Sequence, residues 1–577
     1  MIWPKLRRAL LLVAGAVTAI AAASIATRSG VEAWTTQYTG VSHGESNPTG
    51  AAADIGQSIV IAPDGSVFLA GFLQSSSITL GSLNISASGK EGFVAKFDAD
   101  GDPIWLRTYA ASTGDDVSIY DLEMTPAGDL LIGGRFGGTM TFATAPTPLI
   151  LTSSGGADGF IARLDSSGVP ISAVTVGGVG ADAVHDLAYG PGDTVTAVGI
   201  VAGDAITPTA VAAPWATSPA NDDGVILNLS PQLDIVNWTA RVGGSGDDTL
   251  QDVDVGSDGV IAAVGGVDTR QPLAIVVAPS AASHTIVTPN PGSSSDIVVA
   301  SLATSNDVVS GNWSQIIAGT GVEVADGVVI DDLGRVAVAG YGTGPFEVGG
   351  VSHSSGRNVD TDLIVSQFGA DGTARWSTVI DSGNSRDEAR AIAIAPDGQI
   401  ITVGRYGEPS GTRFLAMAHS PDGTLLWGPV LLGDAANQIA QAAVVSPAGD
   451  VYLTGRFAGG PIDPTDATKT ITVNGGSDIV LVKFTAQFPP STTEVTTTTE
   501  GTTTSDDATT ATHVVGTTLD PTPTSAVGST TMTPTTVSAS FDTAILPSTG
   551  AGSGASITVI LIVSVGCLLA LSARRRF

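Results

Sequence analysis

A short motif recurs seven times along this chain, and this recurrence restricts the possible folds more than any other feature of the sequence. The first copy is Ile61–Gly71, IAPDGSVFLAG, in which Asp64-Gly65 separates two apolar stretches. Glycine tolerates a positive φ and aspartate bonds its own backbone, so this pair favours a tight turn, and the residues after it alternate as in a strand. Every copy ends in glycine, at Gly71, Gly134, Gly199, Gly265, Gly340, Gly404 and Gly455. By subtraction these glycines are 63, 65, 66, 75, 64 and 51 residues apart, which indicates an array of similar structural units.

A second recurrent piece follows each motif after a stretch of variable length. It has an apolar strand, a turn and another strand that usually carries tryptophan, as in Glu91–Trp105, EGFVAKFDADGDPIW. The equivalent positions hold Trp105, Ser172, Trp238, Trp313, Trp376 and Trp427. One unit therefore contains about four strands in roughly 60 residues. Because one such sheet cannot bury both its faces, the sheets must pack on one another, and radial packing gives a β-propeller.

The ends of the array also favour a closed ring. The last copy ends at Asp478–Phe484 with no tryptophan strand after it, whereas Ala33–Tyr38, AWTTQY, supplies such a strand before the first motif. A solenoid has shorter repeats and needs caps, and a β-sandwich needs about 100 residues per unit. We therefore predict that residues 31–488 form an all-β, seven-bladed propeller. In this prediction the N-terminal strand with Trp34 closes the last blade and removes two free sheet edges.

The repeat resembles a known bacterial sequence family. The segments DGFIARLDSSG, GGSGDD and IAPDGQIITVG are similar to the SBBP type of β-propeller repeat, over nearly all of Val31–Phe488. The likeness is weaker in the third and fourth units, where Asp193 and Val260 alter the turn pattern. This resemblance implies a propeller fold and a secreted or surface location, but no particular chemistry, because a fold alone does not give a function.

Two further segments are typical of an exported protein with a stalk. Residues 1–26 combine a basic start (Lys5, Arg7 and Arg8) with an apolar run at Ala9–Ala23, which predicts a cleaved signal peptide. A short membrane anchor or a buried helix is the alternative. Residues 489–545 are rich in Thr, Ser and Pro without periodicity, which predicts an extended, disordered stalk. The sequence does not decide whether the stalk is glycosylated.

Residues 546–577 resemble the sortase sorting signal of Gram-positive cell-wall proteins. Leu546-Pro547-Ser548-Thr549-Gly550 precedes an apolar run and then Arg574–Arg576, and we predict a transmembrane segment at 557–573. The resemblance implies that a sortase attacks the Thr549 carbonyl and breaks the Thr549–Gly550 bond. A peptidoglycan precursor then accepts the chain, so the protein is in the membrane only before sorting. The alternative is a permanent single-pass anchor.

Few residues of the repeats suggest chemistry. Asp98, Asp100 and Asp102 have the spacing of a calcium loop, but sibling units use the same place as a turn, so a hairpin turn is the preferred interpretation and we expect no cofactor. The pairs Asp115-Asp116 and Asp247-Asp248 follow glycine repeatedly, which favours turn capping over paired catalytic carboxylates. The six histidines share no metal-ligand spacing, and no serine-nucleophile or phosphate-binding motif is present.

The formal charge of −31 argues against nucleic acid as a partner. We expect a secreted protein that is attached to peptidoglycan at the cell surface, has a sortase as processing partner, and binds an unknown extracellular ligand. That ligand is expected to be a glycan or a protein, and the chain is expected not to be an enzyme. Two alternatives stay open: a surface enzyme acting on polysaccharide, and a structural wall component. A cluster of His, Asp and Arg in the propeller channel would favour the enzyme.

Overall fold

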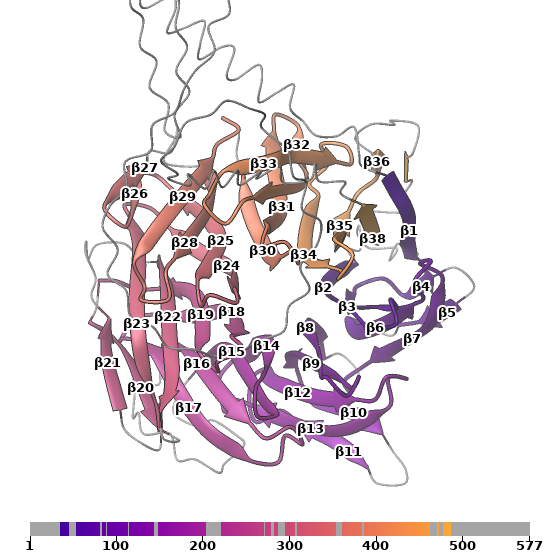
Figure 1. The fold of residues 1–577 in the computed structure, drawn as a ribbon. Coiled ribbons are helices and arrows are strands. Elements are labelled where there is room, and N and C mark those ends of the chain that lie inside the picture. The colour runs from indigo at the N-terminus through magenta and orange to yellow at the C-terminus, as the bar shows by residue number, and fades with distance from the viewer. Residues whose placement is uncertain are drawn as a thin grey trace, which may run out of the picture. The chain divides into compact units, whose positions relative to one another are not determined.

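The computed structural model places the repeats in a ring of seven antiparallel sheets around a central channel (Figure 1). It describes residues 35–44, 54–80, 83–87, 89–112, 115–143, 148–202, 221–270, 272–278, 282–286, 295–305, 308–353, 360–383, 386–461, 470–471 and 477–485. All regular elements in these ranges are strands, with no helix among them. The predicted seven-bladed β-propeller is therefore confirmed.

Each blade has four strand positions, numbered from the channel outwards as innermost, second, third and outer. Blade 1 contains β2 (Ile55–Ile61), β3 (Val67–Leu73), β6 (Glu91–Phe97) and β7 (Pro103–Tyr109). Blade 2 contains β8 (Val117–Met124), β9 (Leu130–Phe136), β12 (Asp158–Leu164) and β13 (Pro170–Val176). Blade 3 contains β14 (Ala183–Gly190), β15 (Thr194–Ala202), β16 (Asp222–Leu229) and β17 (Val236–Gly243). Blades 4 and 5 contain β18 (Thr249–Val255), β19 (Ile261–Val267), β22 (Asp296–Ser305) and β23 (Val308–Gly319); and β24 (Glu323–Ile330), β25 (Val336–Thr343), β28 (Thr361–Phe368) and β29 (Ala374–Ile380). Blades 6 and 7 contain β30 (Glu388–Ile394), β31 (Ile400–Glu408), β32 (Gly411–His419) and β33 (Leu425–Leu432); and β34 (Ile439–Val445), β35 (Asp450–Phe457) and β38 (Asp478–Thr485).

Extra hairpins lie between the second and third strands of five blades. They are β4 (Ser77–Leu80) with β5 (Leu83–Ser86), β10 (Thr139–Ala143) with β11 (Leu149–Thr152), β20 (Leu273–Ala278) with β21 (Ala282–Ile286), β26 (Phe346–Val348) with β27 (Val351–His353), and β36 (Gly460–Pro461) with β37 (Thr470–Ile471). Two of these hairpins pair with the outer strand of the preceding blade, β20 with β17 and β26 with β23. These hairpins cover sheet edges that would otherwise be free to pair with another chain.

The N-terminal strand β1 (Thr35–Gly44) runs antiparallel to β38, with Thr35 opposite Thr485 and Val41 opposite Val480. Its far end pairs with β4 of blade 1. Trp34 lies outside the described residues, and so do all the side chains of β1. Closure of the ring by the Trp34 strand therefore stays a prediction.

Tryptophans of the outer strands connect neighbouring blades. Trp313 Nε1 donates a hydrogen bond to the Ala370 carbonyl of blade 5 at 3.0 Å, and Trp376 Nε1 donates to the Pro421 carbonyl of blade 6 at 3.4 Å. The turn glycines lie directly against these rings, so that a Cβ on Gly423 would be 2.6 Å from Trp376. Apolar side chains of adjacent blades fill the space between the sheets, as Phe68 of blade 1 does with Phe136 and Phe160 of blade 2.

Three of the predicted segments lie outside the described residues: the signal peptide at 1–26, the stalk at 489–545, and the sorting signal at 546–577 with its membrane segment. Within the ranges given above, no helix has the length and hydropathy needed to span a bilayer.

Candidate functional site: the central channel

Every blade sends one polar side chain into the channel from the same structural position. Each innermost strand contains a β-bulge where its pairing with the second strand shifts by one residue. The bulged residues line a cavity of about 600 Å³ and are Gln57, Tyr120, His185, Gln251, Asp326, Arg390 and Gln441. A bulge re-aims its side chain, which explains why all seven face the channel instead of a neighbouring blade.

Carboxylates that follow the bulge join one blade to the next. Asp121 accepts a hydrogen bond from Ser58 Oγ of blade 1 at 2.8 Å and from the Leu187 backbone N–H of blade 3 at 3.1 Å. Asp186 accepts from the Val253 N–H at 2.9 Å. Asp252 accepts from the Val328 N–H at 2.7 Å. These aspartates occupy equivalent positions in blades 2, 3 and 4, so they have a structural role in addition to any chemical one.

The carboxyl groups of the channel hold protons more tightly than free aspartate does. Burial raises the pKa of Asp186, and its neighbours Asp252 and Asp121 raise it further. The Asp186 carboxyl hydrogen-bonds that of Asp252, whose own pKa is raised by burial. Two residues after Asp121 on strand β8, burial and then the charge of Asp121 raise the pKa of Glu123 to about 8. One side of the channel therefore carries carboxyl groups that keep their protons to a higher pH than free carboxylic acids do.

His185 lies next to this acidic group. Its Nδ1 is 2.7 Å from the Leu250 carbonyl, so Nδ1 carries the hydrogen and Nε2 is left as an acceptor in the neutral ring. Burial lowers the pKa of His185, which keeps the ring neutral at pH 7. Tyr120 packs edge-on against it, with ring centroids 5.9 Å apart. The channel thus places a neutral histidine beside a tyrosine, and Asp121, Asp186 and Asp252 line the same cavity.

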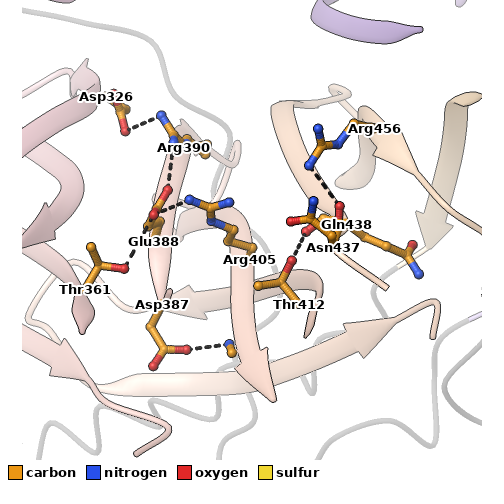
Figure 2. Close-up of polar contacts among 11 residues, drawn as sticks. Asp326, Thr361, Asp387, Glu388, Arg390, Arg405, Thr412, Asn437, Gln438 and Arg456 are labelled. Atoms are coloured by element: carbon orange, nitrogen blue, oxygen red, sulfur yellow. Dashed lines mark hydrogen bonds and ion pairs between the residues drawn. The ribbon is translucent and has the colours of Figure 1, made fainter. Parts of the chain in front are cut away.

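The opposite side of the channel contains charged pairs (Figure 2). Arg390 donates to Asp326 Oδ2 at 3.0 Å and to Glu388 Oε2 at 2.7 Å. Glu388 also accepts from Arg405 of the neighbouring strand β31. Two carboxylates therefore balance two guanidinium groups, and this network joins blade 5 to blade 6.

One group of carboxylates could hold a metal ion. Asp362, Asp381 and Asp387 each offer an oxygen within 4.8 Å of the others, at the junction between blades 5 and 6. Burial and the charges of Asp381 and Asp387 raise the pKa of Asp362 to about 7. Oxygen ligands in such a group suit calcium, although three carboxylates alone do not complete its coordination.

The residues singled out in the sequence lie elsewhere, mostly in turns. Asp98 accepts the N–H groups of Asp100 and Asp102 at 3.0 and 2.8 Å, which is the geometry of a hairpin turn; binding of calcium at this turn stays a prediction. Asp248 accepts the N–H groups of Gly244 and Asp268 at 2.7 and 2.9 Å, as a turn cap does. Neither group reaches the channel.

The sequence reasoning missed the channel residues, although the repeats contain a signal for them. Each bulged residue precedes the closing glycine of its motif by 14 positions, as in 71 − 57 and 404 − 390. Counting back from the seven glycines would have found the complete set. Their chemical character could not be read in this way, because it depends on which residues of other blades lie opposite.

Comparison with known proteins identifies no family. No family model matches the chain, and no curated protein matches it. Among solved structures, a protein of unknown function from Dyadobacter fermentans is 13% identical, with a TM-score of 0.36, over 78% of this chain and 98% of its own. Polysaccharide lyase Uly1 is 8% identical, with a TM-score of 0.36, over 74% of this chain and 89% of its own. A glucose dehydrogenase is 10% identical, with a TM-score of 0.32, over 78% of this chain and 98% of its own.

The expectation that the chain is not an enzyme needs correction. Solved structures that match the chain include polysaccharide lyases and glucose dehydrogenases, and these low similarities transfer no activity but leave no ground for excluding one. The expectation rested on the absence of a catalytic set along the sequence. The channel assembles His185, Tyr120 and several carboxyl groups from separate blades, which no local motif could reveal.

Proposed function

We propose that this chain is an exported surface protein that binds an extracellular ligand at the propeller channel. The observation that carries the binding role is the convergence of seven polar side chains, one from each blade, on one cavity of about 600 Å³. That volume is typical of ligand pockets, and amide, hydroxyl and charged groups give such a pocket its specificity. The SBBP-type likeness of the repeats and the two terminal sequence patterns agree with a surface location.

The binding role is tested by filling the channel. Gln441→Trp puts a large side chain into the cavity, and Ile171→Trp adds the same group on β13, where Ile171 is exposed at the outer strand of blade 2. Binding of the full chain to a glycan array and to whole cells should be lost with Gln441→Trp and kept with Ile171→Trp, at similar melting temperatures. Equal binding by both variants would show that the channel is not the binding site.

Covalent attachment to the wall is the second part of the proposal. It rests on Leu546-Pro547-Ser548-Thr549-Gly550, followed by an apolar run and three arginines. Thr549→Ala should move the protein from the covalently bound wall fraction to the membrane or the medium, as measured by immunoblotting after wall digestion. Ser548→Ala changes the variable position of the motif and should leave attachment unchanged. Unaltered wall attachment of Thr549→Ala would disprove the sorting signal.

An enzyme acting on polysaccharide is the second candidate function, favoured by the neutral His185 beside Tyr120 in a cavity that Asp186 also lines. Such a set can transfer protons at neutral pH. The full chain, incubated with a panel of polysaccharides, should then release reducing ends, and His185→Gln should abolish this release because glutamine keeps the bond to Leu250 but cannot act as a base. His353→Gln, outside the channel, is the matched control. Release at an unchanged rate by His185→Gln would rule out this mechanism.

A further inference from the structure

Three arginines gather near the channel where the innermost strands of blades 6 and 7 begin. Arg405 and Arg456 occupy the same position in neighbouring blades, directly after the closing glycines at 404 and 455. Arg386 precedes the innermost strand β30 by two residues and is exposed. We call Arg386, Arg405 and Arg456 the rim arginines. Figure 2 shows Arg405 and Arg456 on adjacent blades, with Arg390 of the channel beyond Arg405.

Two of the rim arginines have no carboxylate partner among the described residues of this strongly acidic protein. The chain has 55 Asp and Glu against 24 Lys and Arg. Among the described residues, seven arginines form ion pairs, whereas Arg386, Arg456, Arg107, Arg135 and Arg375 form none; the paired ones are Arg163, Arg241, Arg270, Arg335, Arg390, Arg405 and Arg413. Among the described residues, Arg456 donates only to the backbone carbonyl of Asn437, at 3.0 Å, and no ion pair or hydrogen bond joins Arg386 to any of them. Arg405 is paired with Glu388, but its buried Nε has no hydrogen-bond partner.

The rim arginines are also held close together despite their like charges. Burial lowers the pKa of Arg456, and the charges of Arg405 and Arg386 lower it further. Such an arrangement raises the free energy of the unliganded protein. A bound anion would remove this cost, because guanidinium groups form strong, often bidentate hydrogen bonds with oxyanions.

The backbone conformation of Arg386 is a second, independent observation about this arginine. Its φ of 79° lies in the left-handed region, which is unfavourable for a side chain of this kind. The equivalent residue of blade 7 is Asn437, with a φ of 59°, and asparagine is one of the residues that adopt this conformation most readily. Blade 6 thus carries a charged residue in a backbone conformation for which blade 7 has an asparagine.

We propose that the rim arginines bind the carboxylate or sulfate groups of an acidic polysaccharide. This inference rests on the proposed ligand-binding function of the channel and names the class of ligand. Arg386 and Arg456 supply guanidinium groups that no carboxylate of the described residues pairs with, and Arg405 contributes a further positive charge. The bulged residues Gln57, Gln251 and Gln441 of the channel supply amides that can pair with sugar hydroxyl groups.

The test measures binding of the full chain to polygalacturonate, dextran sulfate and neutral dextran by biolayer interferometry at low and high salt. Arg386→Asn removes the charge and installs the residue that blade 7 uses, so the fold should keep or gain stability. Arg456→Gln removes the other free charge. Arg375→Gln is the control, because Arg375 is exposed on β29 and bonds Gln367, and its loss changes the net charge by the same amount.

We expect one of the acidic polymers to bind, neutral dextran not to bind, and salt to weaken binding. Each rim variant should lower the affinity by about tenfold, since each removes a charged hydrogen-bonding group, whereas Arg375→Gln should stay near wild type. Preference for polygalacturonate or for dextran sulfate distinguishes carboxylate from sulfate. Binding by rim variants as strong as by wild type, or binding of neither acidic polymer, would overturn the proposal. If neutral glycans bind and Gln441→Trp abolishes their binding, the acidic-polysaccharide proposal is overturned and the ligand-binding function of the channel is kept. If Gln441→Trp abolishes the binding of no ligand, the ligand-binding function itself is contradicted.

Discussion

At the scale of single residues, the closing glycine of the motif is explained by the bulge opposite to it. Next to the bulge of the innermost strand, the carbonyl oxygen of the residue two positions before the bulged residue lies close to the closing glycine of the second strand. A Cβ on Gly404 would lie 2.0 Å from the Glu388 oxygen, and a Cβ on Gly455 would lie 2.2 Å from the Ile439 oxygen. The same bulge points Arg390 or Gln441 into the channel. The glycine and the channel residue are therefore two consequences of one backbone feature.

Gly404→Ala should consequently destabilise the propeller by roughly 3 kcal/mol or more, because a backbone oxygen cannot give way as a flexible side chain would. Urea unfolding followed by tryptophan fluorescence measures this change. Gly89→Ala is the control, since a Cβ there meets nothing within 4 Å. A Gly404→Ala protein as stable as the Gly89→Ala protein would contradict the role given to the bulge.

At the scale of elements, a blade is stable only with its neighbours. Outer-strand tryptophans donate to the next blade's turn, channel aspartates accept from the next blade's innermost strand, and hairpins extend the preceding blade's sheet. Blade 7 differs, because β38 is the last described strand and the chain supplies no later one with tryptophan. Strand β1, which pairs with β38, is the element available to complete it.

Deleting residues 31–38 should therefore lower the melting temperature much more than the removal of an unattached tail would. The expected cause is the loss of the Thr35–Thr485 end of the β1–β38 ladder and the exposure of the edge of blade 7. Differential scanning calorimetry of the deletion variant, beside a variant that lacks residues 496–540 of the predicted stalk, measures the difference. Identical melting of the two would rule out closure by the N-terminal strand.

At the scale of the whole molecule, buried carboxylates recur at the junctions between blades. In each pair, one carboxylate lies at the start of the third strand of a blade and the other lies at or just before the start of the next blade's innermost strand. The pairs are Asp158 with Asp182, Asp223 with Asp248, Asp296 with Glu323, and Asp362 with Asp387. Burial raises the pKa of Asp182 and Asp248 to about 6 and, with Asp296, raises that of Glu323 to about 9. In the 6–7 junction the equivalent residues are the neutral Thr412 and Gln438.

These shifts predict a propeller that is more stable at pH 6.5 than at pH 9. The folded pKa of Glu323 is above its unfolded value of about 4.5, so the folded state keeps a proton that the unfolded state releases, and stability falls as the pH rises toward 9. The buried histidines, whose pKa values are lowered, oppose this only below about pH 6.5.

Glu323→Gln should flatten this dependence, because the amide does not titrate. Melting temperatures of the wild type and of Glu323→Gln, measured from pH 6.5 to 9, should differ more at pH 9, where the wild type carries a buried charge. Asp165→Asn, which changes a carboxylate in an exposed hairpin turn, serves as the control. Parallel curves for the wild type and Glu323→Gln would contradict the assignment.

The seven blades, their strands and their turns could be predicted from the order of the residues alone, because each depends on residues close together in the chain. Asp64-Gly65 forms a turn, and the strand after it alternates, whatever lies beyond the blade. The role of the residues 14 positions before each glycine became visible in the folded ring, because the ring brings seven separate segments to one axis. There burial raises the pKa of Asp186 and Glu388 gains two arginine partners, while Arg386 and Arg456 have no carboxylate partner among the described residues. The charge and reactivity of the channel side chains depend on how deeply they are buried and on which residues of other blades lie beside them, and both are properties of the assembled ring.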